Sequence, residues 1–441
     1  MKGKNKIKDQ FNEYAKPMII RSIFQSIMNI ADKLVAALFI GAPALVATTL
    51  ISPLMFLVGS IAMFFISGLA AYIGLLIGLE KVDKANKVSS GILILMAVVG
   101  ILLTIPGFFF TEKLAYFLGA RGVFFKLSVE YLRIFSLAFP LLLVGRGLDV
   151  LILNDGDPSY SFALNMITTI LNLCFNIYTV VILGMGIKGL ALATVVSSGV
   201  QMIGGLAYFA FKNQTLKLMM PTFSFKITFR IMYNGFSDFA MTIVESVMIY
   251  VINIAFIRYL SPEHFEAYAT TTIIFTIFYS IYMGASYGLQ PILSKKMGQK
   301  KYETLRKLIE HSVKKTAIYG LIAYLLGIFI IDDLLSMFIR NTTTIEFARF
   351  FYITIGFSTI LSNYPLQMSM FFTAINRPLE SSAISIFRTL VLIPVLTFSF
   401  IRLFGPIGVA LGYMVSDILM IISVKIFMQR IDLSTLELYE S

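Results

Sequence analysis

The sequence GIKGLAL at residues 186–192 returns as GPIGVAL at residues 405–411, 219 positions later. Three further landmarks recur at a displacement of 220 positions: Gly68 as Gly288, residues 77–81 as 297–301, and Pro158 as Pro378. Landmarks that repeat in the same order at nearly the same displacement indicate an internal duplication. The chain is therefore expected to consist of two similar halves.

The composition of both halves is that of a membrane protein. Hydrophobic residues make up 58% of the chain and charged residues only 14%, with a mean hydropathy of +0.84. Soluble domains carry about 25% charged residues. A transmembrane helix needs about 20 apolar residues in succession, and backbone groups in a bilayer must bond within their own segment. Twelve helical spans fit the sequence, near residues 17–40, 45–78, 88–110, 127–150, 161–183, 187–211, 233–258, 266–293, 313–331, 347–375, 382–402 and 408–428.

These spans predict an all-α polytopic membrane protein with twelve transmembrane helices in two pseudo-symmetric six-helix lobes. We assign residues 1–211 to an N-terminal lobe, 212–232 to a cytoplasmic inter-lobe linker, and 233–441 to a C-terminal lobe. A duplicated helical membrane unit is the usual construction of a secondary transporter, in which the substrate passes between the two halves.

The net charge of +12 follows the expected topology and does not indicate a nucleic-acid partner. Most Lys and Arg residues lie in the two tails and in the even-numbered connections between spans, and the densest group lies at residues 295–315. Under the positive-inside rule both termini then face the cytoplasm, and we expect a multi-pass protein of the cell membrane. The group at 295–315 also leaves open a contact with anionic lipid head groups.

Three carboxylates lie deep within expected spans, where a charge is costly and usually marks a function. They are Asp32 in the first span, Glu245 in the seventh and Asp417 in the twelfth. Arg388, in the eleventh span, is the deepest cation and is expected to pair with Glu245 or Asp417. Two interpretations of this pair stay open, a structural ion pair and a part of the substrate path. Other acids, Asp149 among them, lie near the ends of spans and need no functional explanation.

Polar residues of the fifth and sixth spans are candidates to complete a cation site around Asp32. Asn172 and Asn176 are four residues apart, so they share one face of a helix. Thr194 lies in the first turns of the next span. Together with Asp32 they supply a carboxylate, two amide oxygens and a hydroxyl, and hard cations such as Na⁺ prefer oxygen ligands. The alternative is that the amides and the hydroxyl only hold neighbouring helices together.

Other kinds of site are not expected. The chain has a single cysteine, Cys174, and only two histidines, His264 and His311, which lie near helix ends. Disulfide frameworks and metal centres need several such residues at suitable spacings. An enzyme site within the membrane would need a converging set of His, Ser or metal ligands. We therefore expect no enzymatic activity, no cofactor and no metal beyond Na⁺ at the cation site.

The chain resembles the multidrug and toxic compound extrusion (MATE) family over nearly its whole length. The sequence NIAD at residues 29–32 resembles that family's first helix, with its membrane-embedded Asp. NDGDP at 154–158 and GMGIKGLALAT at 184–194 resemble the signatures that lead into its fifth and sixth helices. Arg388, followed by FGPIGVA at 404–410, resembles the matching C-terminal pattern.

The resemblance implies two six-helix lobes around a central cleft, and export of organic cations or other amphipathic compounds by alternating access, driven by H⁺ or Na⁺. It places the cation site of the N-terminal lobe at four residues: Asp32, Asn172, Asn176 and Thr194. Family members with a Na⁺ site commonly have Asp at the position of Asn176, so both ions stay open here. In the C-terminal lobe Glu245 matches a glutamate that serves some members, and Asp417 and Arg388 are further candidates to contact substrate or protons.

One alternative within the same wider superfamily is a flippase of lipid-linked precursors. Its diphosphate substrate would favour a cationic cavity, to which only Arg133, Arg146 and Arg388 could contribute. The buried acids are stronger functional candidates than these three cations. We therefore expect a cation-coupled antiporter that acts as a monomer, with a small organic substrate and the lipid bilayer as its partners.

Overall fold

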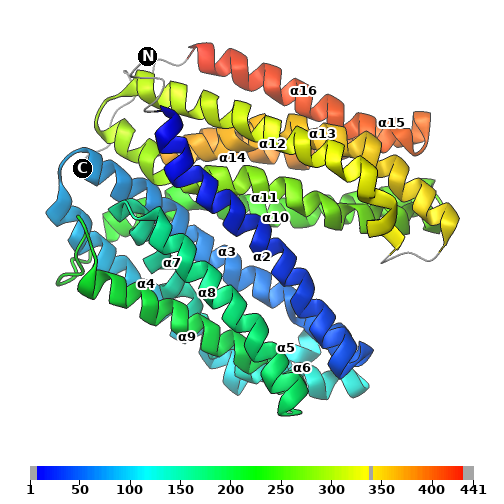
Figure 1. Ribbon diagram of the computed structural model, residues 1–441, viewed down its shortest axis with the longest axis horizontal. Helices are drawn as coiled ribbons and strands as arrows, with labels where there is room; N and C mark the ends of the chain where they lie inside the picture. The colour runs from blue at the N-terminus through cyan, green and yellow to red at the C-terminus, as the bar shows by residue number, and fades with distance from the viewer. Residues whose placement is uncertain (1–6, 337–340, 431–441) are drawn as a thin grey trace. The chain divides into compact units, whose positions relative to one another are not determined.

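The computed structural model describes residues 7–336 and 341–430, and within several helices it describes only the backbone of some residues. The described residues form helices joined by short connections, and no β-strand occurs among them (Figure 1). By internal packing the chain divides into two compact units. We call Phe24–Gly235 the N unit, and the described residues of Met1–Ile23 and Phe236–Ser441 the C unit. The lobe boundaries at 211 and 233 stay a prediction.

Two long helices belong to both units. Helix α2 (Lys16–Val35) starts in the C unit, and α10 (Phe225–Tyr259) starts in the N unit. The N unit further contains η2 (Ala36–Ile40), α3 (Ala42–Gly78), α4 (Val82–Phe109), α5 (Thr111–Phe117), α6 (Gly122–Phe135), α7 (Ala138–Asp155), α8 (Pro158–Ile177), η3 (Tyr178–Ile182) and α9 (Ile187–Phe211). The C unit further contains η1 (Phe11–Ala15), α11 (Pro262–Gly298), α12 (Tyr302–Ser336), α13 (Thr342–Ala374), α14 (Pro378–Ile386), η4 (Phe387–Leu392), α15 (Ile393–Phe404) and α16 (Ile407–Arg430). The elements named η are short π-helical segments.

Each of the twelve predicted spans falls on a helix. Among the described residues, nine helices are long and apolar enough to cross a membrane, and the bent pair α6–α7 is a tenth candidate. Helices α2 and α10 occupy the remaining two predicted spans, the first and the seventh. Large apolar side chains on α12 are exposed every three or four residues, as on a lipid-facing helix: Ile318, Leu321, Ile322, Leu325, Leu326 and Phe329.

The fourth predicted span is broken, which the sequence reading did not anticipate. Helices α6 and α7 meet at an angle of 47°. Pro140 is the cause, because a proline ring clashes with the carbonyl four residues earlier, here that of Ser136. This carbonyl instead accepts hydrogen bonds from the Phe139 N–H at 3.1 Å and from Thr104 Oγ1 of α4 at 2.8 Å. The short helix α5 was also not predicted.

The duplication is visible in the backbone angles. Six residues with positive φ form three pairs at the displacement of the repeat: Glu80 with Lys300, Gly156 with Asn376, and Gly186 with Gly405. Residues other than glycine seldom adopt this left-handed region. Glu80, Lys300 and Asn376 do so just after the ends of helices, where a left-handed residue stops the helix. The two halves therefore end corresponding helices in the same way.

Glycines at equivalent positions also allow equivalent close contacts. A Cβ on Gly68 of α3 would lie 1.8 Å from the carbonyl oxygen of Ile231, at the start of α10. A Cβ on Gly288 of α11 would lie 2.5 Å from the carbonyl oxygen of Tyr14, in η1. In each unit a glycine is required because two helix backbones touch.

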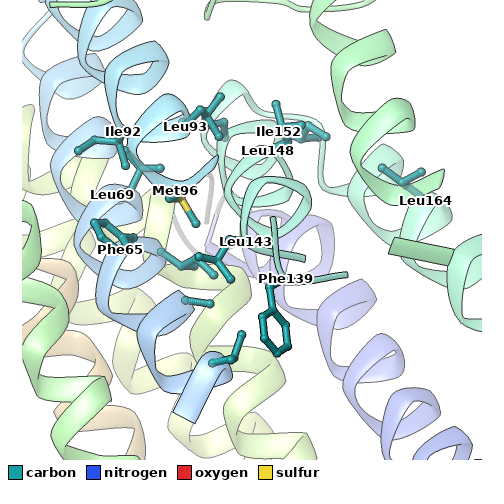
Figure 2. Packing of buried hydrophobic residues seen from close by; sticks show 14 of the residues in the cluster. Phe65, Leu69, Ile92, Leu93, Met96, Phe139, Leu143, Leu148, Ile152 and Leu164 are labelled. Atoms are coloured by element: carbon teal, nitrogen blue, oxygen red, sulfur yellow. The ribbon is translucent and has the colours of Figure 1, made fainter. Parts of the chain in front are cut away.

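The core of the N unit lies where α3, α4 and α7 pack together. Figure 2 shows side chains of this core from three helices: Phe65 and Leu69 on α3, Ile92, Leu93 and Met96 on α4, and Phe139, Leu143, Leu148 and Ile152 on α7. Gly147 brings α7 close to α4, since a Cβ there would lie 2.9 Å from both Leu93 and Met96. These helices provide the framework against which α8 and α9 are placed.

The segment between α9 and α10 is bound to the N unit by one buried carboxylate. Asp155, at the end of α7, accepts hydrogen bonds from the backbone N–H groups of Gln214, Thr215 and Leu216 at 2.5–2.6 Å. It also accepts from the hydroxyl of Tyr208 at 2.8 Å. Four donors satisfy the buried charge, so these residues are held in place.

Candidate functional site

In the N unit Asp32 and its neighbours lie near the ends of two helices, α2 and α8, each of which continues into a π-helical turn. Asp32 lies near the end of α2, just before η2, and Asn172 and Asn176 lie near the end of α8, just before η3. A π-helical turn inserts one extra residue into the helix and is frequent at functional sites. It changes the direction in which the side chains on either side of it point. Here it separates the polar residues from the apolar residues that follow.

Asn176 links Asp32 to Asn172. Its Nδ2 donates to Asp32 Oδ1 at 2.9 Å and to Asn172 Oδ1 at 3.3 Å. Asn172 donates in turn from Nδ2 to Ser197 Oγ on α9, at 3.1 Å. An N–H donor stabilises an ionised carboxylate, so this arrangement suits Asp32 in its charged form.

The oxygen of the same amide is unused. Asn176 is 1% exposed, and its Oδ1 accepts no hydrogen bond from any described residue. Leaving a buried acceptor unsatisfied costs about 1–3 kcal/mol. The oxygen can therefore accept a cation or a hydrogen-bond donor. Asp32 contacts the nitrogen of the same amide group.

Thr194 joins this cluster only indirectly. Its Oγ1 lies 3.5 Å from the carbonyl oxygen of Leu190 in its own helix and makes no described bond to Asp32 or to the two asparagines. Its carbonyl oxygen accepts from Ser197 Oγ at 3.1 Å, and Ser197 is the residue that contacts Asn172. The sequence analysis missed Ser197, although its position three residues after Thr194 puts both on one helix face.

The C unit contains a second buried centre, formed by Arg388 and Asp417. Arg388 Nε, in η4, donates to Asp417 Oδ1 of α16 at 2.6 Å. Of the two partners predicted for Arg388, the described structure has it paired with Asp417. Ser362 of α13 donates to Asp417 Oδ2 at 2.6 Å and accepts from Arg388 Nη2 at 2.7 Å. Ser358 lies 3.4 Å from the same carboxylate oxygen.

This second centre is nearly closed. Asp417 is fully buried and the Arg388 side chain is 11% exposed. Both carboxylate oxygens have donors, and removing one partner of such a pair would leave an uncompensated charge. The geometry therefore favours a structural ion pair that holds η4, α13 and α16 together. Glu245, the other predicted partner, lies in α10, but its side chain is outside the residues that the structure describes.

Asp149 lies in a third buried polar network, which the sequence analysis missed. The sequence analysis places Asp149 near the end of a span, but α7 continues to Asp155 and Asp149 is only 4% exposed. Its Oδ1 accepts from Ser161 Oγ at 2.5 Å and from Asn165 Nδ2 at 2.9 Å, both on α8. In the C unit Ser369 bonds Ser381 and Ser385 at the equivalent positions, at 2.9 Å and 2.7 Å. Because the repeat keeps the bonds but not the carboxylate, we infer that this network holds helices together.

The MatE family model matches the chain twice, at residues 17–179 and at residues 239–399. The two matches together cover well over half of the sequence, and one falls in each repeat. The chain belongs to the MATE family.

Related proteins align with this MATE protein over nearly its full length. The multidrug export protein MepA of Staphylococcus saprophyticus is 22% identical over 408 residues, which cover 92% of this chain and 89% of MepA. A solved MATE structure in complex with MaD3S has a TM-score of 0.89 at 20% identity, with 96% of both chains covered. An outward-facing multidrug resistance MATE transporter has a TM-score of 0.90 at 19% identity, over 96% of this chain and 95% of the other. These structures show that the fold is shared, so the predicted family and the two-lobe helical fold are confirmed.

Proposed function

We propose that this MATE protein exports small organic cations or other amphipathic compounds in exchange for H⁺ or Na⁺. MepA, named as a multidrug export protein, supports export of this kind. The observation that carries the coupling is the cluster of Asp32, Asn176 and Asn172, in which one carboxylate faces an amide with an unused oxygen. A carboxylate with adjacent neutral oxygens can hold one proton or one Na⁺, and it changes its charge when the ion leaves.

The amide of Asn176 provides a simple switch. With Asp32 ionised and no cation bound, the amide N–H groups face the carboxylate and Asn172. A bound Na⁺ needs oxygens, so the amide would rotate and present Oδ1 beside Asp32. A protonated Asp32 would likewise donate its O–H to that oxygen. Na⁺ and H⁺ thus both stabilise the amide orientation with Oδ1 toward Asp32, whereas the ion-free state has Nδ2 toward Asp32. The ion therefore interacts with different energies with the two amide orientations.

The two ions compete for one carboxylate, so release of either can be coupled to export. Since Asn176 replaces a second acid, Na⁺ meets one charge instead of two, and we give H⁺ the preference.

Alternating access of the two halves is the expected mechanism for a transporter built from two repeats. Glu245 is proposed as a substrate or proton group of the C-terminal lobe. We further propose a monomer in the cell membrane with both termini in the cytoplasm.

The flippase alternative is not favoured. Arg388, the deepest cation available for a diphosphate, is already neutralised by Asp417 at 2.6 Å. Arg133 lies 3.9 Å from Glu112, and its side chain is about half exposed. The comparisons likewise point to multidrug MATE proteins.

Dye transport in everted membrane vesicles tests the proposal. Ethidium uptake is followed by fluorescence while a pH gradient or a Na⁺ gradient is imposed separately, and vesicles without the protein provide the baseline. We expect gradient-driven accumulation above this baseline, with the larger response to the pH gradient. Equal uptake with and without either gradient would contradict coupled export.

A further inference from the structure

A cleft of about 700 Å³ lies in the C unit, away from Arg388 and Asp417. It is bounded by the first turns of α12, the last third of α13 and the end of α16, and its walls combine charged and apolar residues: Arg306, Glu310, Lys314, Tyr364, Met368 and Lys425. Neither the proposed transport function nor the buried ion pair accounts for a mixed cleft at this position.

Three cations and one acid set the charge of the cleft. Arg306, Glu310 and Lys314 follow one another at intervals of four residues, so they lie on one face of α12. Lys425 faces them from α16, with its ammonium 5.8 Å from the ring centroid of Tyr364 on α13. The cleft therefore carries a net charge of +2 from these four residues.

The cations are not neutralised by the protein. Among the described residues no carboxylate lies within ion-pair distance of Arg306, Lys314 or Lys425. Arg306 donates from Nη2 to the carbonyl oxygen of Met428 at 3.0 Å, which orients it but leaves its charge unpaired. Three unpaired cations that converge on one cleft favour an anionic ligand.

The position of the cleft along the helices limits what that ligand can be. Residues 316–331 of α12 contain no charged side chain, and at 1.5 Å per residue they span about 24 Å. The cleft begins directly before this stretch, at the level where a membrane helix meets the head groups. Tyr364 fits the same level, because aromatic residues gather at the membrane interface.

We propose that this cleft binds the phosphate head group of an anionic phospholipid. Arg306, Lys314 and Lys425 contact the phosphate, as in other basic pockets between transmembrane helices. Ile309, Val313 and Met368 form the apolar part of the same cleft. Glu310 weakens the attraction and keeps binding reversible.

The absence of tryptophan from the sequence allows a direct experiment. The Tyr364→Trp variant carries one Trp inside the cleft and keeps an aromatic ring under Lys425. The full-length variant is placed in bilayers with equal amounts of brominated phosphatidylglycerol or brominated phosphatidylcholine, and quenching of the Trp is compared. Phe329→Trp, at an exposed position on the same helix as Arg306 and Lys314, reports the bulk lipid composition.

We expect phosphatidylglycerol to quench the Trp at position 364 more strongly than phosphatidylcholine, and to quench the Trp at position 329 no more strongly. Adding Lys314→Gln and Lys425→Gln, which leaves the Arg306 bond to Met428 intact, should weaken the preference by about thirtyfold, since two cations near a membrane surface contribute on the order of 1 kcal/mol each. Glu310→Gln should strengthen the preference. This gain is not expected from a merely structural role.

Two results with control variants or competitors would overturn the proposal, and a third would contradict it directly. One is an equal loss of preference when the exposed lysines Lys217 and Lys226 of the N unit are changed to Gln, because net charge alone would then explain the result. The other is displacement of the lipid by millimolar glycerol 3-phosphate, which would show a site for free phosphate. Equal quenching of the Trp at position 364 by the two lipids would contradict it outright.

Discussion

At the scale of single residues, the two buried centres differ in how fully their hydrogen-bonding groups are used. Asp417 receives donors on both carboxylate oxygens, and Arg388 and Ser362 complete a closed set. At Asp32 the only described side-chain donor is the amide of Asn176, whose own oxygen is unpaired. A closed set resists a new ligand, whereas an unpaired oxygen beside a carboxylate favours one. We therefore propose that ions are exchanged at Asp32 and not at Asp417.

The Asn176→Asp variant should make transport depend more strongly on Na⁺. At 4 Å and an effective dielectric of about 20, a second charge contributes roughly 4 kcal/mol before desolvation. Even a third of this would lower the half-saturating Na⁺ concentration by about tenfold. Ethidium export at a series of Na⁺ concentrations measures the change, with Ser159→Asp, at an exposed position in the first turn of α8, as the control. An unchanged Na⁺ dependence would remove Asn176 from the site.

The Arg388→Leu variant should lose about 3–5 kcal/mol of stability, because it leaves Asp417 charged and buried. If the ion pair is structural, the double variant Arg388→Leu, Asp417→Leu should recover most of the lost stability and retain transport. Thermal unfolding of the purified variants in detergent gives the comparison. A stable double variant without transport would instead place the pair in the substrate path.

At the scale of helices, apolar length predicted where the spans lie, and α9 matches its predicted range of residues 187–211. The break between α6 and α7 was missed because apolar length alone does not show where a proline bends a helix. The Ser136 carbonyl, which Pro140 cannot bond, accepts from Phe139 N–H and from Thr104 of α4, and the latter contact depends on another helix. The pairing of Asn176 with Asp32 was predicted from helix spacing and the family resemblance together. The contribution of Ser197 was not, because spacing alone does not tell which hydroxyl of a helix face meets α8.

Two glycines on α3 provide a matched test of helix contact. Gly68→Ala should destabilise the protein by about 1–3 kcal/mol, because its Cβ would lie 1.8 Å from the Ile231 carbonyl oxygen. Gly59→Ala has no atom within 4 Å of the new Cβ and should stabilise the helix by about 0.5–1 kcal/mol. Thermal unfolding of the two variants should shift in opposite directions. Equal shifts would mean that the close contact at Gly68 is absent.

At the scale of the whole molecule, the duplication preserved the backbone and let the chemistry diverge. The left-handed helix ends recur at equivalent positions in both halves. The buried charges do not, since the position equivalent to Asp32 is Ile252 and the position equivalent to Asp417 is Ser198. The Asp32 cluster and the Arg388–Asp417 pair are thus each confined to one half, which suits the proposed division between an ion site and a structural ion pair.

The topology offers a test that does not depend on either site. A reporter enzyme fused after Ser441 should be active only in the cytoplasm, because the basic connections predict cytoplasmic termini. A second fusion in the 295–315 segment should agree with it. An extracellular signal at Ser441 would overturn the assigned orientation.

Asp32 itself gives the most direct test of the proposed mechanism. Asp32→Asn keeps an oxygen for the Asn176 amide but removes the charge, and Glu112→Gln removes an exposed acid of the same unit. Both variants are compared with the unaltered protein for ethidium accumulation in everted vesicles, at equal folded yield, under the pH gradient and the Na⁺ gradient. We predict that Asp32→Asn falls to the level of vesicles without the protein under both gradients, while Glu112→Gln is unaffected. Normal export by Asp32→Asn under both gradients would show that the coupling ion binds elsewhere.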